Sequence, residues 1–177
     1  LKDLVFIEEE GDKTQLIDIV FNHIHAVLTY RASVNISGKH PINKVIFGLQ
    51  NSEICLLDQI KRYAGLIETE ANVFEFSYIN ISEYVIPRVR PNFKTIGLSF
   101  RNNMKQITSF LQNEHENKTV AQYIKKDKFC YVNISGETFH ITQEHIELYN
   151  QYKPIDGYKL YSDGDITVFI DDRDTPE

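Results

Sequence analysis

A positively charged segment stands out in an otherwise acidic chain. Between Ile86 and Asn113 the sequence carries five cations and no acid, although the 177 residues together hold 19 Lys and Arg against 25 Asp and Glu, a net charge of −6. The five cations are Arg88, Arg90, Lys94, Arg101 and Lys105. Lys and Arg neutralise nucleic-acid phosphates independently of base sequence, so these five are candidate RNA-binding residues. The alternative is an exposed face whose cations pair with nearby acids, each pair contributing little.

Histidines and carboxylates suggest no metal site. His23 and His25 stand two apart in a predicted helix, where such residues point to different sides and do not chelate together. His140 lies in a predicted strand and Glu144 and His145 beyond a turn, so a shared metal is not favoured. A hairpin turn and a solvated charge run explain the last group of acids, which comprises Asp163, Asp165, Asp171 and Asp172. We therefore expect no bound metal.

Motifs for catalysis are missing from the sequence. It contains no Gly-rich phosphate loop, no nucleophile elbow and no paired-cysteine zinc motif. Cys55 and Cys130 sit in apolar segments, which is typical of small reduced core residues in a cytosolic protein. No apolar run approaches the roughly 20 residues that span a bilayer, and the N-terminus lacks the layout of a signal peptide. We expect a cytoplasmic chain without catalytic residues, cofactor or membrane partner.

The first long element is predicted to be a helix from about Thr14 to Arg31. Apolar residues recur there at i, i+3, i+4 and i+7, and further apolar positions widen the stripe. A stripe this wide requires packing partners, and the sequence supplies no partner helix nearby. We therefore expect the helix to come from a helical bundle that lies outside this chain. Leu1 is not an initiator methionine, which fits a piece of a longer protein.

The next segment predicts a strand–helix–strand unit. Ile42–Gly48 is rich in β-branched residues and forms a strand, and Phe74–Tyr78 alternates aromatic with polar residues as a strand with one buried face. Between them, Ser52 can cap a helix that we expect Gly65 to end.

The remainder predicts a strand, a turn, helices and two hairpins. Glu83–Arg90 is a strand that Pro87 confines to an edge or a bulge. It is followed by a helix over Leu98–Asn113 and one further turn at Thr119–Ile124. The hairpins turn at Ser135–Gly136 and Asp163–Gly164. The predicted fold class is α+β: an N-terminal helix followed by a mixed α/β module.

Three stretches carry a resemblance to a known family. Lys39–Val45 reads Lys-His-Pro-Ile-Asn-Lys-Val, Val89–Gly97 reads Val-Arg-Pro-Asn-Phe-Lys-Thr-Ile-Gly, and Leu160–Asp171 contains Ser-Asp-Gly-Asp-Ile-Thr-Val. In this order they resemble Arg-Gln-Pro-Leu-Ser-Lys-Val, Val-Lys-Pro-Asn-Phe-Lys-x-Leu-Gly and Ala-Ser-Asp-Gly-x-x-Thr-Val. These motifs belong to the C-terminal region of isoleucyl-tRNA synthetases of the archaeal and eukaryotic type, which are class I enzymes.

The resemblance implies a non-catalytic part of a tRNA ligase. The full enzyme would use ATP, with Mg²⁺, to activate isoleucine and transfer it to tRNA(Ile), in catalytic and editing domains upstream of Leu1. Residues 1–37 would be the end of the anticodon-binding helical bundle or a linker. Residues 38–177 would be the C-terminal α/β module that helps to hold the anticodon arm. The implied partners are tRNA(Ile) and the remaining domains of the same synthetase.

Departures from the family's pattern bear on the RNA contacts. Lys39 and His40 replace the usual Arg-Gln pair, Arg101 stands where the family commonly has a second glycine, and Ser99 where it often has a basic residue. Two other interpretations stay open. The chain is either a structural module that packs on the synthetase without touching RNA, which its acidic net charge favours, or an unrelated cytosolic binding domain.

Overall fold

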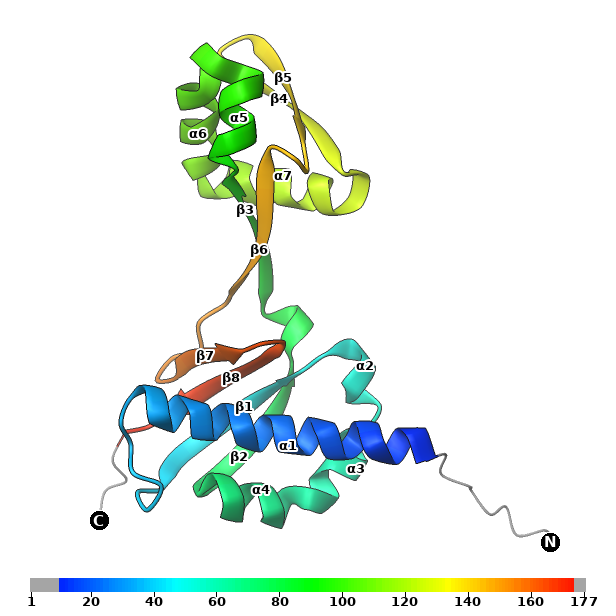
Figure 1. Ribbon diagram of the computed structural model, residues 1–177, viewed down its shortest axis with the longest axis vertical. Helices are drawn as coiled ribbons and strands as arrows, with labels where there is room; N and C mark the ends of the chain where they lie inside the picture. The colour runs from blue at the N-terminus through cyan, green and yellow to red at the C-terminus, as the bar shows by residue number, and fades with distance from the viewer. Residues whose placement is uncertain (1–9, 174–177) are drawn as a thin grey trace, which may run out of the picture. The chain divides into compact units, whose positions relative to one another are not determined.

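A computed structural model describes residues 10–173 and divides the chain into two compact units. The first unit combines the residues up to Glu83 with those from Pro154 onward, and the second is Tyr84–Lys153. Each unit mixes helices with strands (Figure 1). The predicted α+β class is therefore confirmed.

A four-stranded sheet in the order β2, β1, β8, β7 forms the first unit (Figure 1). β1 pairs parallel with β2 and antiparallel with β8, which forms a hairpin with β7. Short helices connect β1 to β2, which confirms the strand–helix–strand unit. The elements are α1 (Glu10–Ser33), β1 (Ile42–Leu49), α2 (Asn51–Ile54), α3 (Leu57–Ile60), η1 (Lys61–Tyr63), α4 (Ala64–Ala71), β2 (Val73–Asn80), η2 (Ile81–Glu83), β7 (Lys159–Asp163) and β8 (Ile166–Asp171).

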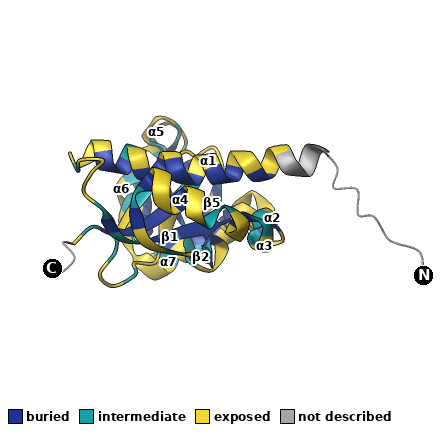
Figure 2. Cartoon of the chain, turned by 90° about the horizontal axis from the view of Figure 1, so that it is seen from below, coloured by how far each residue is buried: buried dark blue, intermediate teal, exposed yellow. Residues whose placement is uncertain are grey.

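Helix α1 packs on the sheet of its own unit. Val20 and Val27 are buried in the same apolar core as Phe47 of β1 and Ile170 of β8. The expectation that the sequence supplies no partner for this helix is therefore wrong, because the sheet and α4 cover one side of it. The opposite side faces solvent and leaves apolar side chains exposed (Figure 2); they are Ile17, Phe21 and Leu28.

The second unit combines two separate antiparallel ribbons with helices. Strand β3 pairs with β6, and β4 forms a hairpin with β5, as the Ser135–Gly136 turn predicts. Both ribbons pack against helices, and the core contains Val89, Ile107, Ile124 and Ile141. The elements are β3 (Val85–Pro91), α5 (Phe93–Phe100), η3 (Arg101–Asn103), α6 (Met104–Gln112), α7 (Glu114–Asp127), β4 (Phe129–Ile134), β5 (Glu137–Thr142) and β6 (Ile146–Tyr152).

The predicted helix over Leu98–Asn113 is broken in the structure. α5 ends and α6 begins on either side of η3, where Arg101 has φ 26° and ψ −92°. A positive φ interrupts right-handed helical geometry and is uncommon for a residue with a Cβ atom. The further turn predicted at Thr119–Ile124 is part of the longer α7, whose N-terminus Asn113 caps by accepting hydrogen bonds from His115 N and Glu116 N.

Two local predictions are wrong, and one strand was missed. Gly65 does not end a helix, because α4 runs through it and ends at Asn72, whose φ of 49° is left-handed. Cys55 is exposed, whereas Cys130 is buried as expected. Strand β6 was not predicted, because only Ile146 of its seven residues is buried and no alternation marks it.

The division into units differs from the expected boundary at residue 38. α1 belongs to the core of the first unit, and the chain passes into the second unit at Tyr84. The origin of residues 1–37 in an anticodon-binding bundle stays a prediction, and residues 1–9 lie outside the described part. Among the described helices, none has both the length and the apolarity needed to cross a bilayer.

Candidate nucleic-acid interface

Charge is distributed unequally between the two units. Tyr84–Lys153 holds ten Lys and Arg against six Asp and Glu, a net charge of +4, and the rest of the chain holds nine against nineteen, a net charge of −10. All five candidate RNA-binding residues belong to this positive second unit. An excess of cations in one compact unit of an acidic chain is the electrostatic pattern of a nucleic-acid-binding surface.

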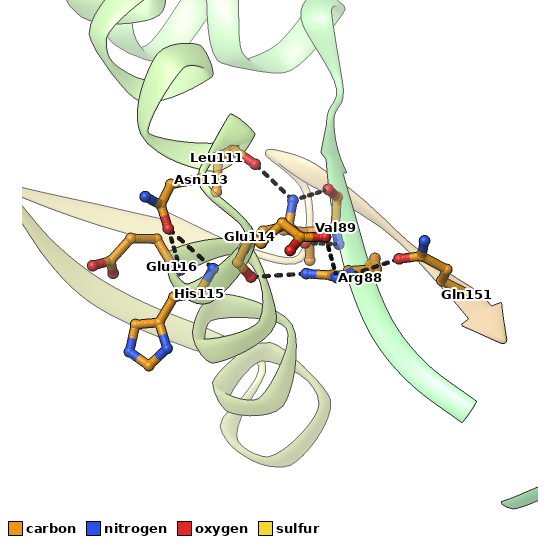
Figure 3. Close-up of polar contacts among 9 residues, drawn as sticks. Arg88, Val89, Leu111, Asn113, Glu114, His115, Glu116 and Gln151 are labelled. Atoms are coloured by element: carbon orange, nitrogen blue, oxygen red, sulfur yellow. Dashed lines mark hydrogen bonds and ion pairs between the residues drawn. The ribbon is translucent and has the colours of Figure 1, made fainter. Parts of the chain in front are cut away.

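Arg88 is held inside the second unit by hydrogen bonds (Figure 3). Its Nε donates to Gln151 Oε1 at 2.8 Å, one terminal nitrogen donates to the carbonyl oxygen of Glu114 at 2.7 Å, and the other donates to Glu114 Oε1 at 3.1 Å. The residue is 9% exposed. These bonds tie β3 to β6 and to the first turn of α7, so the structure gives Arg88 a positioning role.

Asn117 of α7 also holds β3 in place through hydrogen bonds. Its Oδ1 accepts from Val89 N at 2.9 Å, and its Nδ2 donates to Val89 O and to Leu111 O, both at 2.7 Å. The amide thereby takes the place of a neighbouring strand for Val89, whose other side pairs with Leu148 of β6. Buried backbone groups require such partners, and this contact orients the strand that leads into α5.

Arg90 is exposed but already paired across the ribbon. It stands opposite Glu147 in the β3–β6 register, and its Nε lies 2.7 Å from Glu147 Oε2. An ion pair at this degree of exposure contributes little to stability, so the guanidinium can exchange the carboxylate for another anion.

Lys94, Arg101 and Lys105 are exposed on three consecutive elements. Lys94 lies in the first turn of α5, Arg101 begins η3, and Lys105 lies in the first turn of α6. Within residues 10–173, no carboxylate lies within ion-pair distance of any of them. The structure thus separates the five predicted cations into one buried, one paired and three that are exposed and unpaired.

Aromatic residues beside these helices form a feature that sequence reasoning missed. Phe129 and Tyr131 of β4 and His140 of β5 lie on the exposed side of their hairpin, and Tyr123 of α7 is also exposed. The signal was present in the sequence, because β4 places its rings at alternate positions with Cys130 and Val132 between them.

The histidines considered for metal binding have other contacts. His23 is fully buried and His25 is exposed, so they do point to different sides of α1. His145 Nδ1 lies 3.1 Å from Thr142 N and its Nε2 3.1 Å from Ser99 Oγ, and burial lowers its pKa. His140 stacks on Tyr131 instead. Over residues 10–173, no three His, Cys, Asp or Glu side chains lie close enough together to hold a metal ion.

Comparison with known proteins identifies relatives of the chain. No protein-family model matches it. It is 26% identical over 164 residues to the isoleucine–tRNA ligase of Cytophaga hutchinsonii, 22% over 167 residues to that of Thermococcus kodakarensis, and 20% over 157 residues to the cytoplasmic isoleucine–tRNA ligase of Caenorhabditis elegans. These alignments cover 92%, 91% and 88% of this chain but 14%, 15% and 13% of the ligases.

The matches relate the chain to a small part of aminoacyl-tRNA ligases. The part that it matches is the C-terminal region of isoleucine–tRNA ligases, which confirms the resemblance drawn from the three sequence motifs. The chain spans about one seventh of the length of these curated relatives.

Proposed function

We propose that the chain is the C-terminal part of an isoleucine–tRNA ligase and that its second unit helps to bind and position the anticodon arm of tRNA(Ile). The full enzyme would carry out ATP-dependent aminoacylation, with ATP, Mg²⁺ and isoleucine held by domains outside this chain. Its partners would be tRNA(Ile) and those domains. A cytoplasmic location agrees with the name of the Caenorhabditis elegans relative.

The observation that carries the proposal is the exposed cations on the positive unit. Lys94, Arg101 and Lys105 have no carboxylate partner among the described residues, so phosphates can bind them without displacing an acid. Phosphate contacts supply most of the salt-dependent affinity of proteins for nucleic acids. Arg88 supports the surface indirectly, because it fixes β3 against α7.

Binding of tRNA(Ile) to the 177-residue chain at several salt concentrations tests the proposal. With three phosphate contacts, the slope of log affinity against log salt concentration is expected to be about −2. Lys94→Glu and Lys105→Glu each lower the affinity several-fold and flatten the slope. Arg62→Glu makes the same charge change at an exposed position of the first unit, outside the three family motifs, and is the control. A salt-independent affinity, or an equal loss with the control, would contradict the proposal.

A second candidate function is a module that packs on the synthetase without contacting RNA. It is favoured by the apolar stripe of Ile17, Phe21 and Leu28 on α1, where Phe21 is 57% exposed, and by the charge of −10 outside the second unit. In the full-length ligase, Phe21→Glu would then lower the unfolding temperature, while the same change in the 177-residue chain would not. Unchanged tRNA affinity after Lys94→Glu would favour this function over RNA binding.

A further inference from the structure

The outward face of the β4–β5 hairpin carries three aromatic rings in mutual contact. Tyr131 and His140 stand directly opposite each other, with ring centroids 4.8 Å apart and planes at 27°. Phe129 meets His140 edge-on at 5.4 Å and Tyr131 at 5.8 Å. Tyr131 is 67% exposed and Phe129 43%. We call this group of Phe129, Tyr131 and His140 the aromatic platform.

The hairpin does not depend on the aromatic platform for its anchorage. Its other face contributes Cys130, Val132, Phe139 and Ile141 to the core of the second unit, where all four are buried. Large rings held together on the solvent side therefore leave apolar area exposed that the fold does not require. Contiguous exposed apolar patches of this kind mark binding sites.

Shallow hollows continue from the aromatic platform toward Lys105 of α6. One is lined by Tyr123, Phe129 and Tyr131, together with Asp127 and Cys130. A second shares Tyr123 and Tyr131 and reaches Phe110 and Glu116, and a third shares Phe110 and Glu116 and reaches Lys105. The surface thus runs from exposed rings at one end to an expected phosphate-binding lysine at the other.

Charges near the aromatic platform favour a polyanion at its margins. Lys125, Lys126 and Lys128 are exposed immediately before Phe129, at the end of α7. Two carboxylates, Glu116 and Asp127, line the hollows between the lysines and would repel phosphates. Phosphates are therefore best accommodated at the lysine-bearing ends, with bases over the rings between them.

We propose that the aromatic platform stacks unpaired bases of the bound RNA. The proposal rests on the proposed function, because it names a second contact site for the same partner. Exposed aromatic rings beside a cationic strip are the arrangement that binds single-stranded nucleic acids, in which unstacked bases lie on aromatic side chains. A paired helix hides its base faces, so the aromatic platform distinguishes single-stranded from double-stranded RNA.

Binding of the 177-residue chain to an unstructured 12-nucleotide RNA, and to the same RNA annealed to its complement, tests the aromatic platform. Tyr131→Ala is expected to lower the affinity for the single strand about fivefold or more and to leave that for the duplex unchanged. Tyr131→Phe keeps the ring and the affinity. Phe74→Ala, at a 60% exposed aromatic residue of the first unit, is the matched control. Equal affinities of Tyr131→Ala and the unsubstituted chain for the single strand would overturn the proposal.

A tryptophan reporter keeps the test independent of folding defects. The chain contains no Trp, so Tyr131→Trp places a single Trp, which can be excited apart from the tyrosines, on the aromatic platform. Stacking of bases is expected to quench its fluorescence on titration with the single strand but not with the duplex, and Phe74→Trp is expected to show no quenching. Unquenched Tyr131→Trp emission at saturating single strand would also overturn the proposal.

The outcomes separate this inference from the proposed function. If Lys94→Glu weakens binding of both RNA forms and Tyr131→Ala weakens neither, the phosphate surface stands and the aromatic platform fails. If neither RNA form nor tRNA(Ile) binds, both proposals fail. A Tyr131→Ala change that then lowers only the unfolding temperature of the full-length ligase would assign the aromatic platform to a protein contact instead.

Discussion

His23 of α1 stacks on Phe47 of β1 in the core of the first unit, with ring centroids 4.6 Å apart and planes at 17°. The His23 ring is fully buried, and among the described residues neither of its nitrogens has a hydrogen-bond partner. Burial disfavours the charged imidazolium and lowers the pKa of His23 from 6.5 to about 4. The stack therefore requires a neutral ring and makes the first unit sensitive to acid.

Acid is expected to destabilise the first unit through His23. Above pH 6.5 the ring is neutral in both states and the effect is absent. Between pH 6.5 and 4 the unfolded state binds the proton and the folded state does not, so the free energy of unfolding falls by about 1.4 kcal/mol per pH unit, about 3 kcal/mol in all. Urea unfolding of the unsubstituted chain and of His23→Phe at pH 7.5 and 4.5 measures this difference, which the substitution should remove.

Exposed His25 provides the control for that measurement. His25→Gln should leave the His23-dependent loss between pH 7.5 and 4.5 in place. A direct check is an NMR titration of the His23 ring, and a midpoint near 6.5 in the folded chain would contradict the assignment.

Local sequence signals predicted the turns and the helix-forming stretch, but not what each element packs against. The Ser135–Gly136 and Asp163–Gly164 pairs mark hairpins because their glycines tolerate positive φ, 88° at Gly136 and 58° at Gly164. The periodicity of α1 predicted a helix, but its covering surface comes from β1 and from β8, more than a hundred residues later. Helical periodicity cannot reveal a partner that is distant in the chain.

The sequence likewise predicted the cations of the candidate site but not their carboxylate partners. The five cations are close in sequence and were found from that proximity. The carboxylates that bind two of these cations are distant in the sequence, since Glu114 is 26 residues from Arg88 and Glu147 is 57 residues from Arg90. Strand β6, which brings Glu147 to Arg90, has no alternation because most of its side chains face solvent. Sequence alone therefore could not separate the paired cations from the unpaired ones.

Replacement of Asn117 is expected to loosen the second unit. Asn117→Ala leaves two backbone groups of Val89 and one of Leu111 without their partner, and we expect a loss of about 3 kcal/mol in the free energy of unfolding. Amide hydrogen exchange should show lost protection at Val89 and no change at Ile46 in the first unit. Asn102→Ala, at an exposed asparagine of η3, is the control and should stay within about 0.5 kcal/mol.

A result for Asn117→Ala as mild as that of its control would show that water replaces the amide without cost. The assignment of Asn117 as a substitute strand partner for Val89 would then be wrong.

Arg31 is expected to tolerate no conservative replacement. Its guanidinium is buried and donates five hydrogen bonds to carbonyl oxygens, two of them to Ala71 at the end of α4 and the others to Ser37, His40 and Asn72. Lysine has no planar fork to reach them together. Arg31→Lys should therefore lower the free energy of unfolding by about 3 kcal/mol. Thermal unfolding checks this, with exposed Arg62→Lys as the control, and equal stabilities of the two variants would refute the role.

Replacement of Arg101 by glycine is expected to raise the stability of the chain and to lower its affinity for RNA. Its φ of 26° lies where a side chain is rarely accommodated and glycine is favoured. Such a conformation costs about 1–3 kcal/mol, and glycine at this position adds unfolded-state entropy that offsets part of the relief. Arg101→Gly should therefore raise the free energy of unfolding by about 1 kcal/mol while lowering the affinity for tRNA(Ile) several-fold, because an exposed cation is lost.

Asn103→Gly is the control for Arg101→Gly, since Asn103 has an ordinary φ of −96°. With no strain to relieve, it should lower the free energy of unfolding by about 0.5–1 kcal/mol and leave the charge unchanged. Chemical denaturation and a tRNA titration on the same three proteins measure both quantities. A lower free energy of unfolding for Arg101→Gly would contradict the inference that the backbone is strained at Arg101. A stabilised Arg101→Gly with full tRNA affinity would leave the strain in place and remove Arg101 from the proposed interface.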